Sequence, residues 1–215
     1  MRVKLVAITK PLVGDGNMTA SDFITFAARV SNPSNQMSLL TAPKLLAYCI
    51  KNGHWSIFEQ ASMTVEIQTS RAISAQIIRH RSFCFQEFSQ RYAPSDAPEP
   101  VELRSQDRVN RQGSGDSFEK DWAYDVVAKS VNLAFTTYRT LLQEGVSRET
   151  ARMVLPLCTQ TTLYMTGNIR SWIHYLEQRC AKGTQKEHRQ IAEAIRDTIL
   201  AVEFQHIHNA LQEAK

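Results

Sequence analysis

The sequence predicts one α+β domain over residues 1–215, with a mixed sheet flanked by long helices. Two stretches, 2–9 and 62–69, alternate apolar and polar residues as half-buried strands do. Residues 116–144 instead repeat their apolar positions with the spacing of an amphipathic helix. No internal repeat and no Ser/Gly-rich linker divides the chain. A chain of this length can bury a substantial core, so we expect a single domain.

The composition is that of an ordinary globular protein, with 43% hydrophobic and 21% charged residues. The net charge of +4 suits an anionic small molecule as well as a nucleic acid. Cys49, Cys84, Cys158 and Cys180 are scattered without a C-x-x-C pair, which predicts reduced thiols. The first apolar stretch is too short and too charged for a signal peptide, and no run reaches the length of a membrane span. We therefore expect a cytoplasmic protein that does not contact membranes.

In the first half of the chain, capping and turn residues predict helices around the two strands. One helix begins at about Thr19 or Ser21, where the following apolar residues take helical spacing. A second helix begins at Thr41, has Pro43 in its first turn and ends at Gly53. After the second strand, residues 70–79 are predicted to be helical and to lead into a basic segment.

In the second half, the long helix over 116–144 is followed by shorter elements. Ser147 caps a short helix, and residues 159–166 are predicted to form a strand. Asn168 is a good N-cap for the next helix. Residues 184–187 follow the capping-box pattern and open the last helix.

Residues 94–116 separate the basic segment from the long helix. They are polar, and they contain three prolines and the run Gln-Gly-Ser-Gly-Asp. Long connections of this kind are usually functional or disordered. We predict a long mobile loop here, and its closure over a site is an open question.

The most informative stretch is 79–92, which places Arg79, His80, Arg81 and Arg91 around the carboxylate of Glu87. Arginine pairs with phosphate through a planar fork of two donors. A basic helix end would account for the first arginines, but not for the polar residues that follow them. This pattern is not typical of a helix or of a strand with one buried face. We therefore predict a binding site.

The same stretch resembles the signature of the flavin-dependent thymidylate synthases, the thymidylate synthase-complementing family. An Arg-His-Arg triplet at 79–81 is followed after seven residues by Ser89, with Glu87 before that serine and Arg91 after it. Cys84, Gln86 and Gln60 stand where the family often has Ser, Asn and His. Further segments resemble family motifs in the same order, namely 27–31, 53–59, 151–156 and the spacing of Asn168, Arg170, His174 and Arg179.

The resemblance implies the family fold and the family reaction. Members use FAD reduced by NADPH to move the methylene of methylene-tetrahydrofolate onto C5 of dUMP and reduce it to methyl, which gives dTMP and tetrahydrofolate. Because the chain has no Gly-rich dinucleotide loop, NADPH and the folate are expected to dock transiently over the flavin. No metal is expected, because no His, Cys, Asp and Glu cluster has metal-ligand spacing.

The resemblance also implies which residues hold each ligand. The residues for dUMP would be Gln76, Arg79, Glu87, Ser89, Arg91, Arg152 and Arg179. The residues for FAD would be Ser31, His54, Ser56, Arg79, His80, Arg81, Glu87, Asn168, Arg170 and His174. Arg179 would be the catalytic residue, since a cation facing the uracil stabilises the negative charge that develops as N3 ionises.

Other interpretations stay open beside this one. Cys84 lies among cations that favour a thiolate, yet the family needs no protein nucleophile, so we expect a packed or weakly hydrogen-bonding thiol. His188, His206 and His208 match no motif and are interpreted as surface or core residues. The alternative function is a nucleic-acid-binding module built on the basic patch 79–91, although no specific nucleic acid is expected. A member that has lost activity through its departures from the family pattern is a further alternative.

The helix that begins after Asn168 carries a prediction about assembly. Around its axis Asn168 and Arg179 fall within about 20° of each other, while Arg170 and His174 lie nearly opposite. One pocket cannot easily contact both faces. Either the helix breaks before Arg179, or its two faces serve different active sites in an oligomer. The second option agrees with the homotetramer with shared active sites that the resemblance implies.

Overall fold

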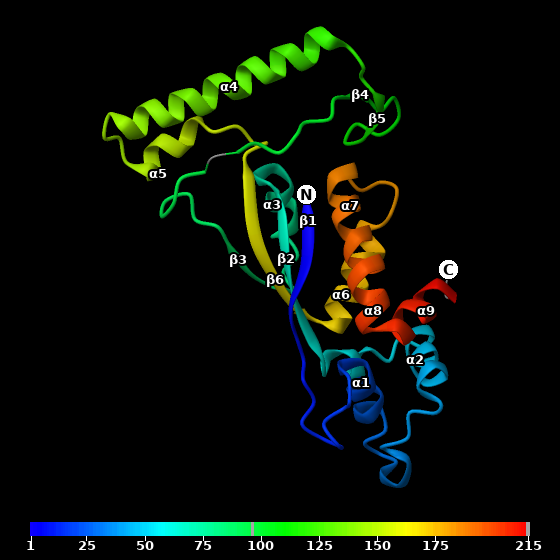
Figure 1. The fold of residues 1–215 in the computed structure, drawn as a ribbon. Coiled ribbons are helices and arrows are strands. Elements are labelled where there is room, and N and C mark those ends of the chain that lie inside the picture. Colours follow the sequence, from blue (N-terminus) through cyan, green and yellow to red (C-terminus); the bar gives the residue numbers. More distant parts are fainter. Residues whose placement is uncertain (96, 214–215) are drawn as a thin grey trace.

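The structure is a computed structural model that describes residues 1–95 and 97–213 (Figure 1). In this part of the chain, the main sheet has four strands in the order β1-β2-β6-β3, and β4 and β5 form a separate hairpin. The strands are β1 Arg2–Ile8, β2 Ser62–Ser70, β3 Cys84–Glu87, β4 Arg104–Gln106, β5 Ser114–Ser117 and β6 Gln160–Asn168. The helices are α1 Ala20–Ala28, α2 Ala42–Lys51, α3 Arg71–Ile77, α4 Asp121–Gln143, α5 Arg148–Ala151, α6 Ile169–Arg179, α7 Lys186–Ile195, α8 Ala201–Glu203 and α9 Gln205–Glu213.

The α+β class is confirmed, but the prediction of a mixed sheet is corrected. Every strand pair of the main sheet is antiparallel within the described residues. The reason lies in the position of β6, which pairs with both β2 and β3. β2 and β3 are joined through α3 and run in the same direction, but β6 lies between them. No parallel pair forms as a result.

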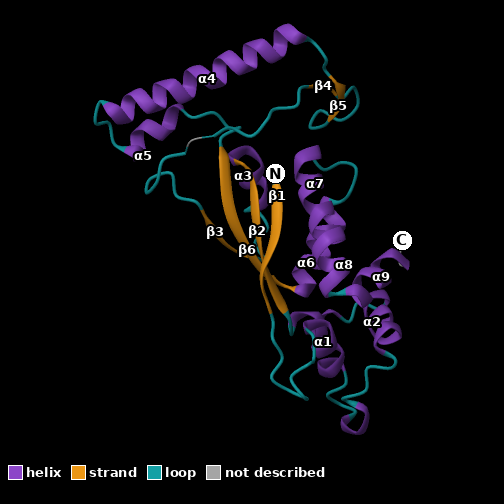
Figure 2. Cartoon of the chain, in the orientation of Figure 1, coloured by secondary structure: helices purple, strands orange, loops and turns teal. Residues whose placement is uncertain are grey.

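The core lies between the sheet and the carboxyl-terminal helices, which cover one face of the sheet (Figure 2). Val65 and Ile67 of β2 and Leu163 of β6 are fully buried, in the alternation that the strand pattern predicted. Trp172 of α6 is also fully buried, and its indole N–H donates to the carbonyl of Met63 at 3.3 Å. The sheet therefore holds α6 in a fixed position beside the end of α3.

A close approach of backbone and ring fixes the entry to β3. Gly167 lies near the end of β6, and a Cβ added there would lie 2.5 Å from the ring of Phe83. Phe83 is buried and packs edge-on against Trp172, with ring centroids 4.8 Å apart. The absence of a side chain at Gly167 therefore lets Phe83 anchor the segment that links α3 to β3.

The predicted caps have mixed outcomes. Asn168 caps α6 as predicted, since its Oδ1 accepts from the backbone N–H of Ser171 at 2.9 Å. Thr19 caps α1, a helix for which only a start at about Thr19 or Ser21 was predicted. The capping box predicted over 184–187 is wrong, because α7 has Gln185 at its N-cap without a side-chain cap bond. The carboxylate of Glu187 instead accepts a hydrogen bond from Arg104 at 2.6 Å.

Several segments differ from their predicted structure. Within the basic stretch 79–92, residues Cys84–Glu87 form the strand β3, which pairs with β6 at the sheet edge. Residues 94–116 contain β4 and most of β5, and Pro98 forms a bridge with Thr159. The long helix α4 begins at Asp121 rather than at residue 116, because β5 extends to Ser117 and Lys120 takes the N-cap position. The last helix is interrupted by a π-helical turn over Arg196–Leu200 and ends at Glu203, with Phe204 at the C-cap before α9.

The helix α4 stands away from the sheet in Figure 1 and packs mainly on α5 and the 3₁₀ turn Arg152–Val154. Trp122, Val126 and Leu133 of α4 are exposed, and Leu133 is 69% exposed. None of the described helices is long and apolar enough to cross a membrane. An apolar face on a helix that leaves the body of the chain indicates a surface for association.

Candidate functional site

The ends of α3 and α6 bring two of the predicted site residues into contact. Arg179 is the last residue of α6, and His80 follows the end of α3. The Nε of Arg179 donates to Nε2 of His80 at 2.7 Å. The pKa of His80 is lowered to about 4, first by burial and then by the Arg179 cation. At neutral pH the ring is therefore uncharged, accepts through Nε2 and carries its proton on Nδ1.

Behind this pair lie two buried aromatic residues that the sequence did not single out as site residues. The ring of Tyr175 packs edge-on against His80 with centroids 4.9 Å apart. The hydroxyl of Tyr175 lies 3.1 Å from Nε2 of His188, and both side chains are almost fully buried. Burial raises the pKa of the Tyr175 hydroxyl, so it stays protonated. The interpretation of His188 as a surface or core residue is thus settled in favour of the core.

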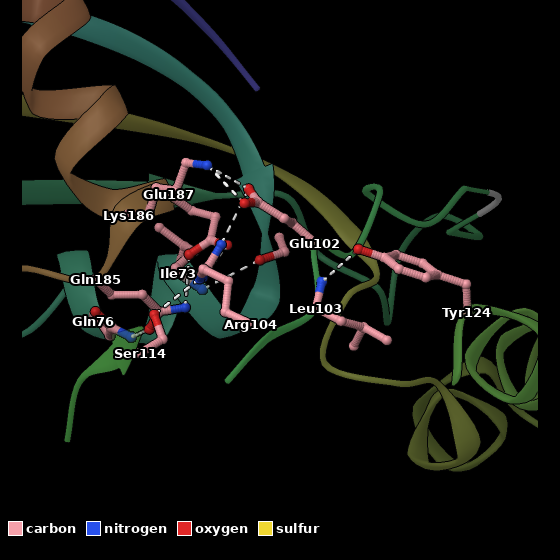
Figure 3. A network of polar contacts seen from close by, with 11 residues as sticks. Ile73, Gln76, Glu102, Leu103, Arg104, Ser114, Tyr124, Gln185, Lys186 and Glu187 are labelled. Atoms are coloured by element: carbon pink, nitrogen blue, oxygen red, sulfur yellow. Dashed lines mark hydrogen bonds and ion pairs between the residues drawn. The ribbon is translucent and has the colours of Figure 1, made fainter. Parts of the chain in front are cut away.

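Gln76 of α3 extends the same cluster towards α7. Its Oε1 lies 3.4 Å from Nδ1 of His188, and its Nε2 donates to Oε1 of Gln185 at 2.6 Å. Figure 3 shows how Gln185 continues into the pair formed by Glu187 and Arg104. Arg104, the first residue of β4, therefore links this strand to the start of α7.

Glu87 at the end of β3 is the centre of a second cluster. Its Oε1 accepts from Ser74 at 2.6 Å and from Thr161 at 3.0 Å, and it pairs with Arg71 at 2.7 Å. Within the described residues no hydrogen bond or ion pair uses Oε2. The carboxylate is therefore held on one side and has one oxygen available to a ligand. Arg71 is a site neighbour that the sequence analysis missed, because it precedes the matched motif.

Ser89, Arg91 and Arg152 lie in a third region, next to α5. Arg91 pairs with Glu149 at 3.0 Å, and the Nε of Arg152 donates to the backbone carbonyl of Glu149 at 3.4 Å. An open cavity of about 410 Å³ here is lined by Ser89, Arg91, Tyr92, Ser147, Arg148 and Glu149. The cavity is lined by two arginines, Arg91 and Arg148, and such donors suit an anionic group.

The opposite face of α6 carries Arg170 and His174. Arg170 pairs with Glu59, and the ring of His174 lies 4.6 Å from the ring of Trp55. The same 3₁₀ turn, Trp55–Glu59, contains Ser56, and His54 precedes it. Since α6 is continuous from Ile169 to Arg179, the option of a break before Arg179 is excluded. Within the described chain the two faces of α6 thus have different neighbours.

Ser31 lines a separate cavity of about 470 Å³ between α1 and α2. Arg29 lines the same cavity, is only 7% exposed and donates through Nη2 to Thr41 at 2.6 Å. Its buried Nη1 has no hydrogen-bond partner within the described residues. The lining also contains Lys44 but no carboxylate. An unpaired buried guanidinium nitrogen is costly, so this cavity suits an anionic ligand.

Arg79 and Arg81 are exposed at the end of α3. In residues 1–95 and 97–213, neither side chain takes part in a hydrogen bond or an ion pair. Cys84 is also exposed, at the edge of the sheet. Nowhere in the described chain do three His, Cys, Asp or Glu side chains come together as metal ligands would. The two arginines are therefore unpaired cations that flank His80 in the sequence.

Comparison with known proteins agrees with the sequence resemblance. The family described as thymidylate synthase complementing protein matches residues 15–202. A probable flavin-dependent thymidylate synthase of Paramecium bursaria Chlorella virus 1 is 50% identical, over 98% of this chain and 99% of the relative. A flavin-dependent thymidylate synthase of Synechocystis is 48% identical, over 91% of this chain and 93% of the relative.

A solved structure gives the same answer for the fold. The UMP/dUMP methylase PolB from Streptomyces cacaoi, bound with 5-Br dUMP, aligns with a TM-score of 0.83 at 28% identity. The alignment covers 99% of this chain and 94% of that one. The alternative of a nucleic-acid-binding module receives no support from these comparisons. The chain belongs to the thymidylate synthase complementing family, the flavin-dependent thymidylate synthases.

Proposed function

We propose that this chain catalyses the reductive methylation of dUMP to dTMP, with methylene-tetrahydrofolate as carbon donor and tetrahydrofolate as product. The observation that carries the proposal is the contact of Arg179 with His80, which the unpaired cations Arg79 and Arg81 flank in the sequence. The relatives in Chlorella virus and Synechocystis are named for this activity, and the methylase of Streptomyces is named for UMP and dUMP.

The residues present fit FAD, which when bound takes reducing equivalents from NADPH and delivers them to the nucleotide. A flavin dinucleotide carries a pyrophosphate, and the unpaired Nη1 of Arg29 in the Ser31 cavity is an orphaned buried donor for such a group. Arg79, His80 and Arg81 supply donors at the end of α3. The proposed set is completed by Arg170 and His174 on the other face of α6, by His54 and Ser56 at its neighbouring turn, and by the N-cap residue Asn168. Glu87 contributes its free oxygen.

For dUMP, the cavity next to α5 is the proposed phosphate site. Arg91 and Arg152 would exchange contacts with Glu149 for contacts with the phosphate, and Ser89 would add a hydroxyl donor. Gln76, Arg79 and Glu87 would hold the rest of the nucleotide. The carboxylate of Glu87 can accept from a sugar hydroxyl or an N–H group through Oε2.

Arg179 is the proposed catalytic residue. His80 accepts from its Nε, which restricts the orientation of the guanidinium, and within the described residues the Nη groups form no hydrogen bond or ion pair. A fixed cation beside the uracil stabilises negative charge at N3 and raises the electron density at C5. Because His80 is neutral, it does not repel Arg179. His80 thus acts as an acceptor that orients the cation.

We propose a homotetramer in which active sites are shared between subunits. The two faces of the continuous α6 have different neighbours, so Arg179 and Arg170 would serve different sites. The exposed apolar residues of α4 would supply association area. NADPH and the folate would dock transiently over the flavin, and residues 94–116 would lie close to them. The protein would act in the cytoplasm.

The test is direct. Purified protein should be yellow, and should form dTMP from dUMP only with methylene-tetrahydrofolate and NADPH present. Because the reducing equivalents come through the flavin, no rise in dihydrofolate absorbance should accompany turnover. Arg179→Lys should retain the flavin spectrum and lose most of the turnover, since lysine cannot reproduce the planar fork. Colourless protein that binds RNA instead would refute the proposal.

A further inference from the structure

The buried imidazole of His188 has no role in the site as assigned above. Its side chain is fully buried, and both ring nitrogens have partners, Tyr175 at 3.1 Å and Gln76 at 3.4 Å. A buried polar ring is costly unless its nitrogens are hydrogen-bonded. Burial, together with the nearby Arg179 and His80, lowers the pKa of His188 to about 4. The ring is therefore neutral at pH 7 and has one N–H donor and one acceptor.

The direction of the hydrogen bonds around Gln76 can be worked out from Glu187. A carboxylate only accepts, so the bond of 3.0 Å between Gln185 and Glu187 must use the Nε2–H of Gln185 as donor. Gln185 therefore turns its Oε1 towards Gln76, whose Nε2 donates to it at 2.6 Å (Figure 3). The carbonyl oxygen of Gln76 then faces the other way, towards His188.

The two hydrogen bonds of His188 on the buried side also have a defined direction. Oε1 of Gln76 can only accept, so Nδ1 of His188 must carry the proton. In a neutral ring Nε2 then accepts, and the hydroxyl of Tyr175 is its donor. A series of hydrogen bonds thus runs from Tyr175 through His188, Gln76 and Gln185 to Glu187, and the donor of each bond is determined. The amide of Gln76 is held at both of its ends.

We propose that His188 is a positioning residue that, with Gln185, fixes the amide of Gln76 so that its second Nε2–H faces an oxygen acceptor of dUMP. The inference rests on the proposed function, which places dUMP at Gln76. A side-chain amide without these partners can rotate by half a turn and present its carbonyl oxygen to the same acceptor. Two oxygens then face each other, and binding weakens. One lost hydrogen bond of this kind corresponds to about five- to tenfold in affinity.

Two substitutions of His188 separate orientation from packing. In His188→Asn the amide nitrogen can occupy the place of Nδ1 and still donate to Gln76. In His188→Gln the amide reaches towards Tyr175, and the donor to Gln76 is lost. Both variants remove the imidazole from the core. A merely structural role of His188 would affect both in the same way, whereas the positioning role separates them.

The measurement is the Kd of dUMP for the flavin-loaded protein by isothermal titration calorimetry, with flavin content and Tm recorded for each variant. We expect His188→Gln to weaken dUMP binding about five- to tenfold relative to His188→Asn, at equal flavin content. His206→Gln in α9 makes the same substitution far from Gln76 and is the matched control. Equal Kd values for the two His188 variants would overturn the inference.

A second variant covers the case in which the buried substitutions do not fold. Gln185 is exposed, so Gln185→Leu releases the other end of the Gln76 amide without disturbing the core. It should also weaken dUMP binding several-fold, and an unchanged Kd would count against the inference. If the wild-type protein itself fails to bind dUMP, the proposed function falls together with the inference. If it binds dUMP and the variants do not differ, the inference alone falls.

Discussion

The neutral, buried His188 should make the stability of the fold depend on pH in a way that can be calculated. Its pKa falls from an ordinary 6.5 to about 4 on folding. As the pH drops through 6.5, the unfolded chain binds a proton that the folded chain does not, so stability is complete above pH 6.5 and is lost as the pH falls towards 4. Between pH 7 and pH 5 the linkage relation gives a loss of about 2 kcal/mol for this one group.

The assay is urea unfolding at pH 7, 6 and 5, followed by circular dichroism at one protein concentration. Other titrating groups contribute to the slope, so the quantity to compare is the difference between wild type and His188→Gln, which removes only this titration. The variant should lose about 2 kcal/mol less than wild type between pH 7 and pH 5. His206→Gln, at a partly exposed position, should follow wild type. Parallel pH profiles for wild type and His188→Gln would refute the reasoning.

Three further predictions follow from packing and exposure. Gly167→Ala should lower the free energy of unfolding by about 1–3 kcal/mol in urea titrations, because its Cβ would overlap the ring of Phe83; an unchanged midpoint would contradict this. Leu133→Glu, on the exposed face of α4, should shift the protein to a smaller species on size-exclusion chromatography with its far-ultraviolet spectrum intact, and an unaltered elution volume would argue against α4 as the association surface. Cys84→Ser should keep most of the dTMP-forming activity, since the thiol lies exposed at the sheet edge, and loss of turnover with flavin still bound would show that Cys84 matters.

The secondary structure was predictable where one local rule decided it. The alternation of β2, the start of α1 near Thr19 and the cap Asn168 are properties of neighbouring residues, and the structure has them as predicted. The capping box before α7 was wrong for a non-local reason. Glu187 has a stronger partner in Arg104, which is distant in sequence and delivers a charged donor at 2.6 Å. The local capping box does not form because a charged residue distant in sequence binds the carboxylate that the box would use.

The sheet was mispredicted for a similar reason. β2 and β3 run in the same direction, and they would form a parallel pair only if they were neighbours in the sheet. The position of β6 between them cannot be read from those residues, because strand order depends on which edges pair across the whole chain. The edge strand β3 was missed because its short, polar run pairs on one side with β6. Such pairing comes from the partner strand, not from the composition of the strand itself.

By itself, the sequence determined the family, because the Arg-His-Arg triplet, Ser89 and the later motifs occur in order along one chain, and family membership depends on residue identity and spacing. It also determined which side chains carry charge. The tertiary structure decided which of them meet. It joined Arg179 to His80, separated Arg170 onto the other face of α6, and turned His188 from an unassigned histidine into the buried partner of Gln76. Contacts between residues about 100 positions apart depend on how helices pack on the sheet, which no local pattern encodes.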